Sequence, residues 1–268
     1  MKKLLITMTV FIFFGAVNAQ EAAGKMIQAG LVLGAGLNFT SQESTLISKP
    51  AAGTDMMVGM NLDLHFSSDN FALSTGIEFE FESFSHSFVE PVYLNHYELE
   101  VLTNSSELMP EGRMLLEERD YQSIYAVLPL MIKFQTYYLG YLRYFGKFGM
   151  RNSFLLQSRA DNYGSSVDDS YSVTSDLELS NMRIPGDLSF YKGSIGLAGG
   201  LEWNFSGGTC LVGELGYYYG FTNLHKGDAW IGDEDKNKSL YEISGNGDKY
   251  VNLRARQRQL LLRVSLLF

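Results

Sequence analysis

In two segments of the sequence, charged residues are spaced so that their side chains would share one face of a β-strand. The acids are Glu78, Glu80 and Glu82, and the bases are Arg143, Lys147 and Arg151. Side chains two residues apart on a β-strand point to the same face, so each set would line one side of a strand. Opposite charges that face each other in a confined space are expected to pair, because an isolated buried charge is strongly destabilising.

Catalysis by a nucleophile would require a histidine next to a serine, cysteine or carboxylate. The chain has four histidines, which are His65, His86, His96 and His225. We single out His86, because Ser83, Ser85 and Ser87 lie close to it in sequence. Serines are common at loop edges, so we predict that the protein is not an enzyme. His65 and Asp63 are expected to belong to a polar interior.

Two acidic segments could in principle hold a cation. The first contains Asp161, Asp168, Asp169, Asp176 and Glu178, and the second contains Asp228, Asp233, Glu234, Asp235 and Asp248. Neither has the ordered ligand spacing of a calcium-binding loop, and the sequence shows no zinc spacing and no glycine-rich nucleotide motif. We therefore expect solvated acidic loops, no metal site and no cofactor.

Eight segments alternate apolar and polar residues with the period of a β-strand. They cover residues 26–39, 55–66, 71–85, 121–134, 141–156, 192–205, 209–221 and 258–268. In the last segment Leu260, Leu262 and Val264 share one phase, and Gln259 and Arg263 share the other. Transmembrane β-barrels alternate in this way, because their lipid-facing and lumen-facing residues alternate along every strand.

The connections between these segments are alternately short and long. Three to six residues join the second segment to the third, the fourth to the fifth and the sixth to the seventh; the long connections span residues 40–54, 86–120, 157–191 and 222–249. Aromatic residues gather near both ends of the segments, as in the two interfacial girdles of a barrel. We predict an all-β fold, an eight-stranded antiparallel transmembrane β-barrel with short periplasmic turns, long external loops and both termini in the periplasm. A soluble eight-stranded barrel is the alternative, although its loops need not alternate so strictly.

The amino terminus has the pattern of a secretory signal peptide. Lys2 and Lys3 precede an apolar run from Leu4 to Phe14, and Val17 and Ala19 suit a cleavage site. The run is too short for a transmembrane helix, which needs about 20 apolar residues. We expect a signal peptide at 1–19 and one barrel domain at 20–268. Removal of two lysines and no acid changes the net charge from −9 to −11, which argues against nucleic-acid binding.

Several strand segments resemble the PorT-like outer-membrane β-barrel domain family. The resemblance lies in Gly30, Gly34, Gly36 and Asn38, in 76–79, in 144–149 and in the segment YAVLPLMIK at 125–133. The last is similar to the family's acidic-Ile-Pro-Leu-Leu-Leu-Lys pattern, but Val127 stands where an acidic residue is common. The resemblance implies an eight-stranded barrel and little about activity, since one branch of the family serves protein secretion.

Four more residues extend the predicted charge network of the lumen: Lys133, Glu202, Glu214 and Arg263. This network could be a polar plug or a charged constriction that conducts small ions. Eight strands enclose a lumen only just wide enough for their own side chains, which favours the plug. We therefore predict a small, largely closed barrel that acts structurally or binds through its external loops. A narrow passive pore and an accessory barrel of a secretion system are the alternatives.

Three arginines, Arg254, Arg256 and Arg258, share the outward phase of the last segment. Ten residues of tilted strand cover about 25 Å of membrane normal, so these arginines should lie at or above the outer headgroup boundary. They could contact lipopolysaccharide phosphates, or they could belong to a barrel wall that extends into water. The expected partners are outer-membrane lipid, lipopolysaccharide and, during biogenesis, the barrel-assembly machinery; a protein partner is not readable from the sequence.

Overall fold

The computed structural model describes residues 27–42, 52–66, 70–95, 113–167, 172–183, 187–206, 208–225, 240–244, 247–250 and 255–268. The predicted signal peptide lies outside these residues. The described residues form a single sheet of eleven strands. The strands are β1 (Ile27–Gln42), β2 (Gly53–His65), β3 (Phe71–Asn95), β4 (Arg113–Gln135), β5 (Leu142–Val167), β6 (Val173–Arg183), β7 (Tyr191–Ser206), β8 (Thr209–Gly220), β9 (Leu240–Ser244), β10 (Gly247–Tyr250) and β11 (Ala255–Leu267).

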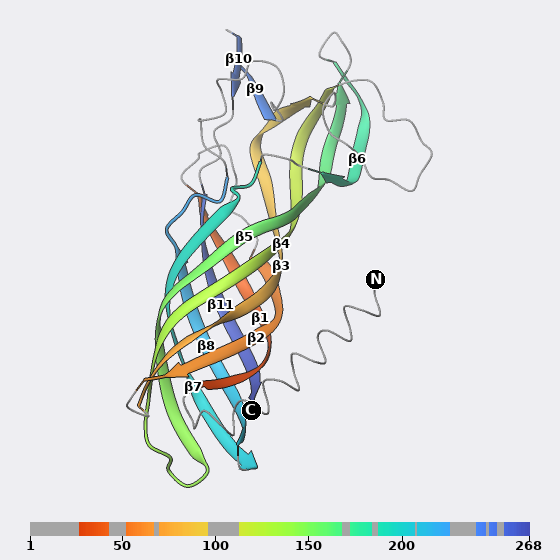
Figure 1. The fold of residues 1–268 in the computed structure, drawn as a ribbon. Coiled ribbons are helices and arrows are strands. Elements are labelled where there is room, and N and C mark those ends of the chain that lie inside the picture. The colour runs from red at the N-terminus through yellow and green to blue at the C-terminus, as the bar shows by residue number, and fades with distance from the viewer. Residues whose placement is uncertain are drawn as a thin grey trace, which may run out of the picture.

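Eight of these strands close into a ring. The hydrogen-bonded order is β3, β2, β1, β11, β8, β7, β5 and β4, and β4 pairs with β3 again. Every pairing in the ring is antiparallel, including the closure between the first and last strands, where Leu33 lies opposite Val264. Figure 1 shows this barrel, with β6, β9 and β10 beyond one end. The predicted eight-stranded transmembrane barrel is confirmed.

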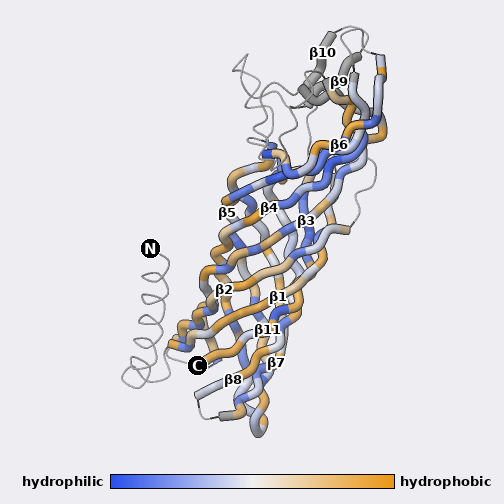
Figure 2. The backbone as a smooth tube through the Cα atoms, turned by 90° about the vertical axis from the view of Figure 1, so that its right-hand side faces the viewer, coloured by the Kyte–Doolittle hydropathy of each residue, from blue (hydrophilic) through white to orange (hydrophobic). Residues whose placement is uncertain are grey.

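Side chains alternate between the two faces of the barrel wall. Leu33, Leu197 and Leu262 point outward and are 58–64% exposed, whereas the inward-facing Lys147 and Glu214 are buried. A soluble barrel would place its leucines inside, but a lipid-facing wall is apolar because hydrocarbon is the surrounding solvent. Figure 2 shows hydrophobic and hydrophilic positions interleaved along the tube. Among the described residues, none belongs to a helix of the length and apolarity needed to cross a bilayer.

The short connections lie at one end of the barrel. They join β2 to β3, β4 to β5 and β7 to β8, and the chain ends nearby at Phe268 (Figure 1). In the turn between β4 and β5, Gly140 has a φ of 69°, a left-handed conformation that glycine adopts without steric cost. The amide of Phe268 donates to the carbonyl of Ala29, which holds the last strand against β1 at this end.

The predicted long connections at 86–120, 157–191 and 222–249 are wrong in part, because they contain β-strands. β3 continues to Asn95 and β4 starts at Arg113, and the two remain paired along this length apart from a bulge after Ser87. β5 reaches Val167 and pairs with β6. Figure 1 shows these strands rising well beyond the rest of the barrel wall. We call this part, formed by β3 from Ser83, β4 to Gln122, β5 from Gln157 and β6, the extension.

The extension has the opposite pattern of polarity from the membrane-spanning wall. Its inward side chains Phe84, Tyr121 and Ala160 form an apolar core together with Leu188 and Leu224, which come from the segments that follow β6 and β8. Most of its outward side chains are polar, as expected for a part surrounded by water and not by lipid, although Val89 and Val173 are also exposed. The predicted limits of β3, β4 and β5, at residues 85, 121 and 156, therefore lie near the level where apolar residues change face.

Candidate functional site

Buried ion pairs cross the lumen near the short-turn end. Lys133 on β4 lies 2.7 Å from Asp63 on β2 and 3.3 Å from Glu202 on β7. Glu202 also accepts from Arg143 on β5 at 2.5 Å, and from the hydroxyl of Tyr138 at 3.1 Å. Lys133, Asp63 and Glu202 are almost completely buried. These contacts connect four separate strands across the interior.

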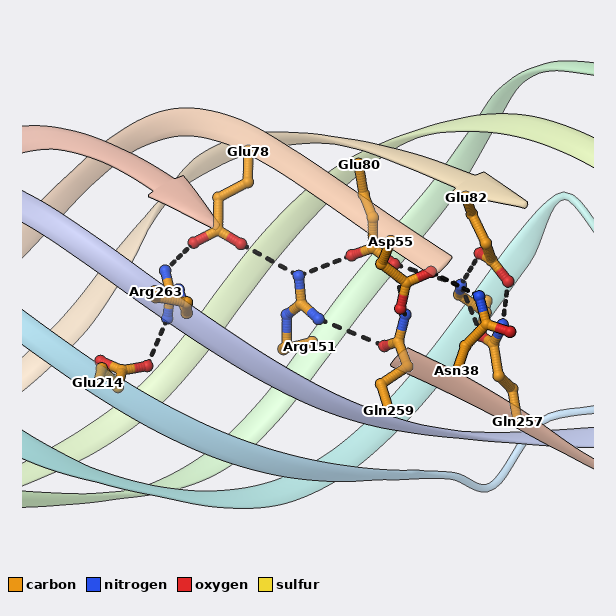
Figure 3. A network of polar contacts seen from close by, with 11 residues as sticks. Asn38, Asp55, Glu78, Glu80, Glu82, Arg151, Glu214, Gln257, Gln259 and Arg263 are labelled. Carbon is orange, nitrogen blue, oxygen red and sulfur yellow. Dashed lines mark hydrogen bonds and ion pairs between the residues drawn. The ribbon is translucent and has the colours of Figure 1, made fainter. Parts of the chain in front are cut away.

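A second chain of ion pairs fills the middle of the lumen. Glu214 on β8 lies 2.7 Å from both Lys147 and Arg263. Arg263 on β11 also pairs with Glu78, which lies 3.2 Å from Arg151 on the far side. Figure 3 shows Glu78 between these two arginines. Each carboxylate therefore faces two cations, which compensates for the loss of water around it.

The chain continues toward the extension through Glu80 and Glu82. Arg151 lies 2.7 Å from Glu80, and Lys192 on β7 lies 2.5 Å from Glu82 and 3.6 Å from Glu80. Gln259 donates to Glu80 at 2.5 Å and to Asp55 at 3.0 Å (Figure 3). A continuous set of ion pairs and hydrogen bonds thus runs from Lys147 to Glu82.

All ten residues of the predicted lumen network lie inside the barrel in ion pairs. The expected pairing of the three β3 glutamates with the three β5 cations is realised only at Arg151. Arg143 pairs with Glu202 and Lys147 with Glu214, because these residues lie nearer the short-turn end than the glutamates of β3. The sequence prediction missed Lys192, although it shares the inward phase of β7 with Glu202.

Aromatic rings fill the space between the charged groups. The Arg151 guanidinium lies 4.9 Å from the ring centre of Tyr218, and the Lys192 ammonium 4.2 Å from that of Tyr125. Tyr218 also packs in a buried apolar cluster with Met57, Met131 and Leu261. Such cation–π contacts are favourable when they are desolvated. The lumen interior is therefore filled by both charged and large apolar side chains.

Three carboxylates in this network are close enough to bind a cation together. Ligand oxygens of Asp55, Glu80 and Glu82 lie within 4.8 Å of one another. The cluster already has donors of its own, since Lys192 contacts both glutamates and Gln259 contacts Asp55 and Glu80. We therefore assign these carboxylates to the network and not to a metal site.

A separate polar cluster is buried in the extension, above the lumen network. The Nε2 atoms of His86 and His225 lie 3.1 Å apart, and Nδ1 of His225 lies 3.1 Å from Asp187. The other Asp187 oxygen accepts from Arg119 at 2.8 Å and from Tyr121 at 3.0 Å. The sequence prediction named His86 as a catalytic candidate but missed Asp187 and His225 as its neighbours.

Burial and hydrogen bonding shift the titration of this cluster. Burial, together with the nearby His225, lowers the pKa of His86 to about 3. Burial acts to raise the pKa of Asp187, but the hydrogen bond and charge of His225 and the charge of Arg119 hold it well below its usual range. Burial also raises the pKa of Tyr121, so its hydroxyl remains a donor. At neutral pH the cluster therefore contains an ionised Asp187 and a neutral His86.

The geometry does not support a serine–histidine pair at His86. His86 points inward with Phe84 and Phe88, whereas Ser83, Ser85 and Ser87 alternate with them on the other face of β3. The Ser85 hydroxyl donates to Asp120 at 2.5 Å, which is also outside the core. The strand period that places His86 inside thus separates it from the three serines.

The other sequence candidates are distributed as follows. Arg256 and Arg258 point outward on β11, and the Arg258 guanidinium lies 5.8 Å from the ring centre of Tyr219. Arg254, His96 and most of the acidic residues singled out in the two long connections lie outside the described residues. Asp161, Asp176 and Glu178 lie on the paired strands β5 and β6 and not in an irregular loop, and Asp248 lies on β10.

Among the solved structures that are similar to this chain at low sequence identity are the following three. Neisserial surface protein A is 11% identical, with 88% of this chain and 95% of that chain covered and a TM-score of 0.32. Ail of Yersinia pestis, solved with the heparin analogue sucrose octasulfate, is 9% identical, with 90% and 99% covered and a TM-score of 0.30. The outer membrane protease OmpT from Escherichia coli is 10% identical, with 92% and 97% covered and a TM-score of 0.34. No curated protein matches the chain.

Residues 18–226 match the family model described as outer membrane protein beta-barrel domain. The match supports the outer-membrane barrel family in general and not the narrower PorT-like assignment suggested by the strand motifs. It covers well over half of the chain and most of the ring strands. The protein therefore belongs to the outer membrane protein beta-barrel domain family and is located in the outer membrane.

Proposed function

We propose that the protein is a closed barrel that anchors the extension at the cell surface, where the extension and the adjacent loops bind a partner or serve a structural role. The observation that carries this proposal is the continuous network from Lys147 to Glu82. It joins β3, β5, β7, β8 and β11 through buried ion pairs. A solute would have to break several of these pairs to pass, at a high desolvation cost.

The extension supports a role outside the membrane. From Ser83 to Asn95, β3 continues for about 40 Å of strand beyond its last outward-facing phenylalanine, at a rise of about 3.3 Å per residue. A barrel that only sealed or stiffened the membrane would not need paired strands of this length. We assign the extension to the cell exterior and both termini to the periplasm, with residues 1–19 as a signal peptide and 20–268 as the barrel domain.

Arg254, Arg256 and Arg258 supply a second proposed contact, with lipopolysaccharide phosphates. The outward direction of Arg256 and Arg258 at the upper end of β11 supports this contact. Guanidinium groups bind phosphate in bidentate geometry, which a surface lysine cannot reproduce. Replacement of all three arginines by glutamine should weaken lipopolysaccharide binding in a pull-down, and unchanged binding would contradict the assignment.

Conductance in a planar bilayer tests the closed lumen directly. The purified wild-type barrel should pass little ion current, whereas Glu78→Gln with Glu214→Gln should raise it, because both partners of Arg263 are then uncharged. A matched control, Glu117→Gln with Glu118→Gln, changes the same charge at two exposed positions of the extension and should leave the current low. Large, stable currents from the wild type would support the pore alternative.

Two other functions have specific tests. An enzyme of the outer rim would show lipid or peptide turnover that His86→Ala abolishes without loss of folding. A secretion accessory, which the PorT-like resemblance suggests, would cause loss of a secreted protein on deletion of the gene. Absence of both effects, together with a low conductance, is the outcome that we expect.

A further inference from the structure

The two histidines in the core of the extension come from distant parts of the chain. His86 lies on β3, and His225 lies just after β8 and forms a bridge with Leu188. Both side chains are almost completely buried, and their Nε2 atoms face each other at 3.1 Å. This close approach is not a consequence of strand pairing, because β3 and β8 are not neighbours in the sheet.

The hydrogen bonds at the far side of each ring determine where the protons lie. Nδ1 of His86 is 3.0 Å from the carbonyl oxygen of Ser85, which can only accept. Nδ1 of His225 is 3.1 Å from a carboxylate oxygen of Asp187, whose other oxygen already accepts from Arg119 and Tyr121. Both Nδ1 atoms therefore carry hydrogen, and in a neutral imidazole the other nitrogen then presents a lone pair.

With hydrogen on both Nδ1 atoms, two Nε2 atoms 3.1 Å apart need either a shared proton or a shared metal ion between or beside them. Two imidazole nitrogens bound to one zinc ion at about 2.0–2.1 Å in tetrahedral geometry are about 3.3 Å apart. The separation of the Nε2 atoms is close to this value. We propose that His86 and His225 bind one borderline divalent transition-metal ion, of the class of Zn²⁺, Cu²⁺ or Ni²⁺, which imidazole ligands favour.

The surroundings of the pair agree with a metal site. A histidine ligand usually donates its other ring N–H to a carboxylate or a carbonyl, and His225 and His86 do this to Asp187 and Ser85 respectively. Asp187 is thus a positioning residue, held in turn by Arg119 and Tyr121. The rings of Phe84 and Tyr121 lie 5.2 Å from the ring of His86 and shield one side of the site.

The charge of the site is also suitable. Arg119 and Asp187 form an ion pair at 2.8 Å, so their charges offset each other beside the two imidazoles. Two protein ligands leave coordination positions for water or for an external ligand. A bound ion would join β3 to the segment after β8 and tie the extension to the opposite wall of the barrel mouth. This site does not depend on whether the extension binds a partner.

Zinc binding to the folded full-length barrel in detergent tests the proposal. A chelator-competition titration should give one tightly bound zinc per chain in the wild type. His86→Asn and His225→Asn should each abolish this binding, and Asp187→Asn should weaken it about 10- to 100-fold, as loss of a second-shell carboxylate does. His65→Asn is the matched control and should bind zinc as the wild type does. His65 is the last residue of β2 and lies at the short-turn end of the barrel, opposite the extension.

Spectroscopy on the wild type keeps the test valid if a variant fails to fold. Zinc should shift the Nε2 resonances of two histidines in ¹⁵N spectra and leave the other two unchanged, and Co²⁺ should give the visible absorption of a nitrogen-bound ion. The proposal is overturned if zinc binds equally well to the folded His86→Asn and His225→Asn variants, which would assign it to the acidic loops. It is also overturned if the two Nε2 atoms share a proton that zinc does not displace.

Discussion

Glu82 and Phe84 are consecutive inward-facing residues of β3, and both are buried, yet one belongs to the lumen network and the other to an apolar core. The outward face changes at the same height, from Phe81 to Ser83. The strand continues without a bulge between these positions. The change of chemistry on both faces therefore marks where the wall leaves the membrane, since lipid favours apolar residues outside and water favours them inside.

Arginine substitutions on the outward face test the position of the membrane. Leu128→Arg and Leu197→Arg, and Leu62→Arg at a partly covered position, should each cost about 2–4 kcal/mol if the residue lies near the midplane. Unfolding in lipid, followed by urea titration, measures this loss. Glu118→Arg, which is exposed on the extension, is the control and should have little effect. Normal stability of all three leucine variants would contradict the barrel orientation.

Epitope tags in the connections test the topology. Tags at Ala51, Glu107, Ser170 and Asn237 should be labelled by antibody on intact cells, because we assign these connections to the exterior. A tag after Tyr137, in the short turn between β4 and β5, should be labelled only after permeabilisation. The reverse pattern would place the extension in the periplasm.

Removal of one carboxylate from the lumen network should destabilise the barrel. Glu78→Gln takes a counter-charge from both Arg263 and Arg151, and breaking a buried ion pair on one side typically costs about 3–5 kcal/mol. Urea unfolding of the folded barrel measures the cost, with Glu117→Gln on the exposed face as the control. A loss below about 1 kcal/mol, which is usual for an exposed pair, would mean that water reaches the network.

Truncation of the apolar core should loosen the extension while the barrel remains closed. Phe84 stacks on Tyr121 with ring centres 4.6 Å apart, and Phe84→Ala should cost about 3–5 kcal/mol locally. Hydrogen exchange should speed up in the extension and remain slow in the membrane-spanning strands. Phe81→Ala, three residues earlier on the lipid-facing side, is the control and should not speed exchange in the extension. Equal effects of the two substitutions would argue against separate cores.

The alternation of apolar and polar residues along the sequence was sufficient to predict the membrane-spanning strands of this protein. Alternation along segments such as 55–66 and 258–268 assigns each residue to a face, because successive side chains of a strand point to opposite sides. The polar phase then contains Glu78, Arg151 and Glu214, and a barrel of eight strands forces them into a lumen where they must pair. Fold class and membership of the charge network are therefore local properties of the sequence.

Tertiary structure decided which charges pair and what lies beyond the membrane. Whether Arg143 meets Glu202 or a glutamate of β3 depends on the register and stagger of strands that are far apart in sequence. The contact between His86 and His225 joins residues 139 positions apart, and the turn residue Asp187 completes it. No local pattern encodes such contacts, because they depend on how the closed ring brings distant strands and turns together in space.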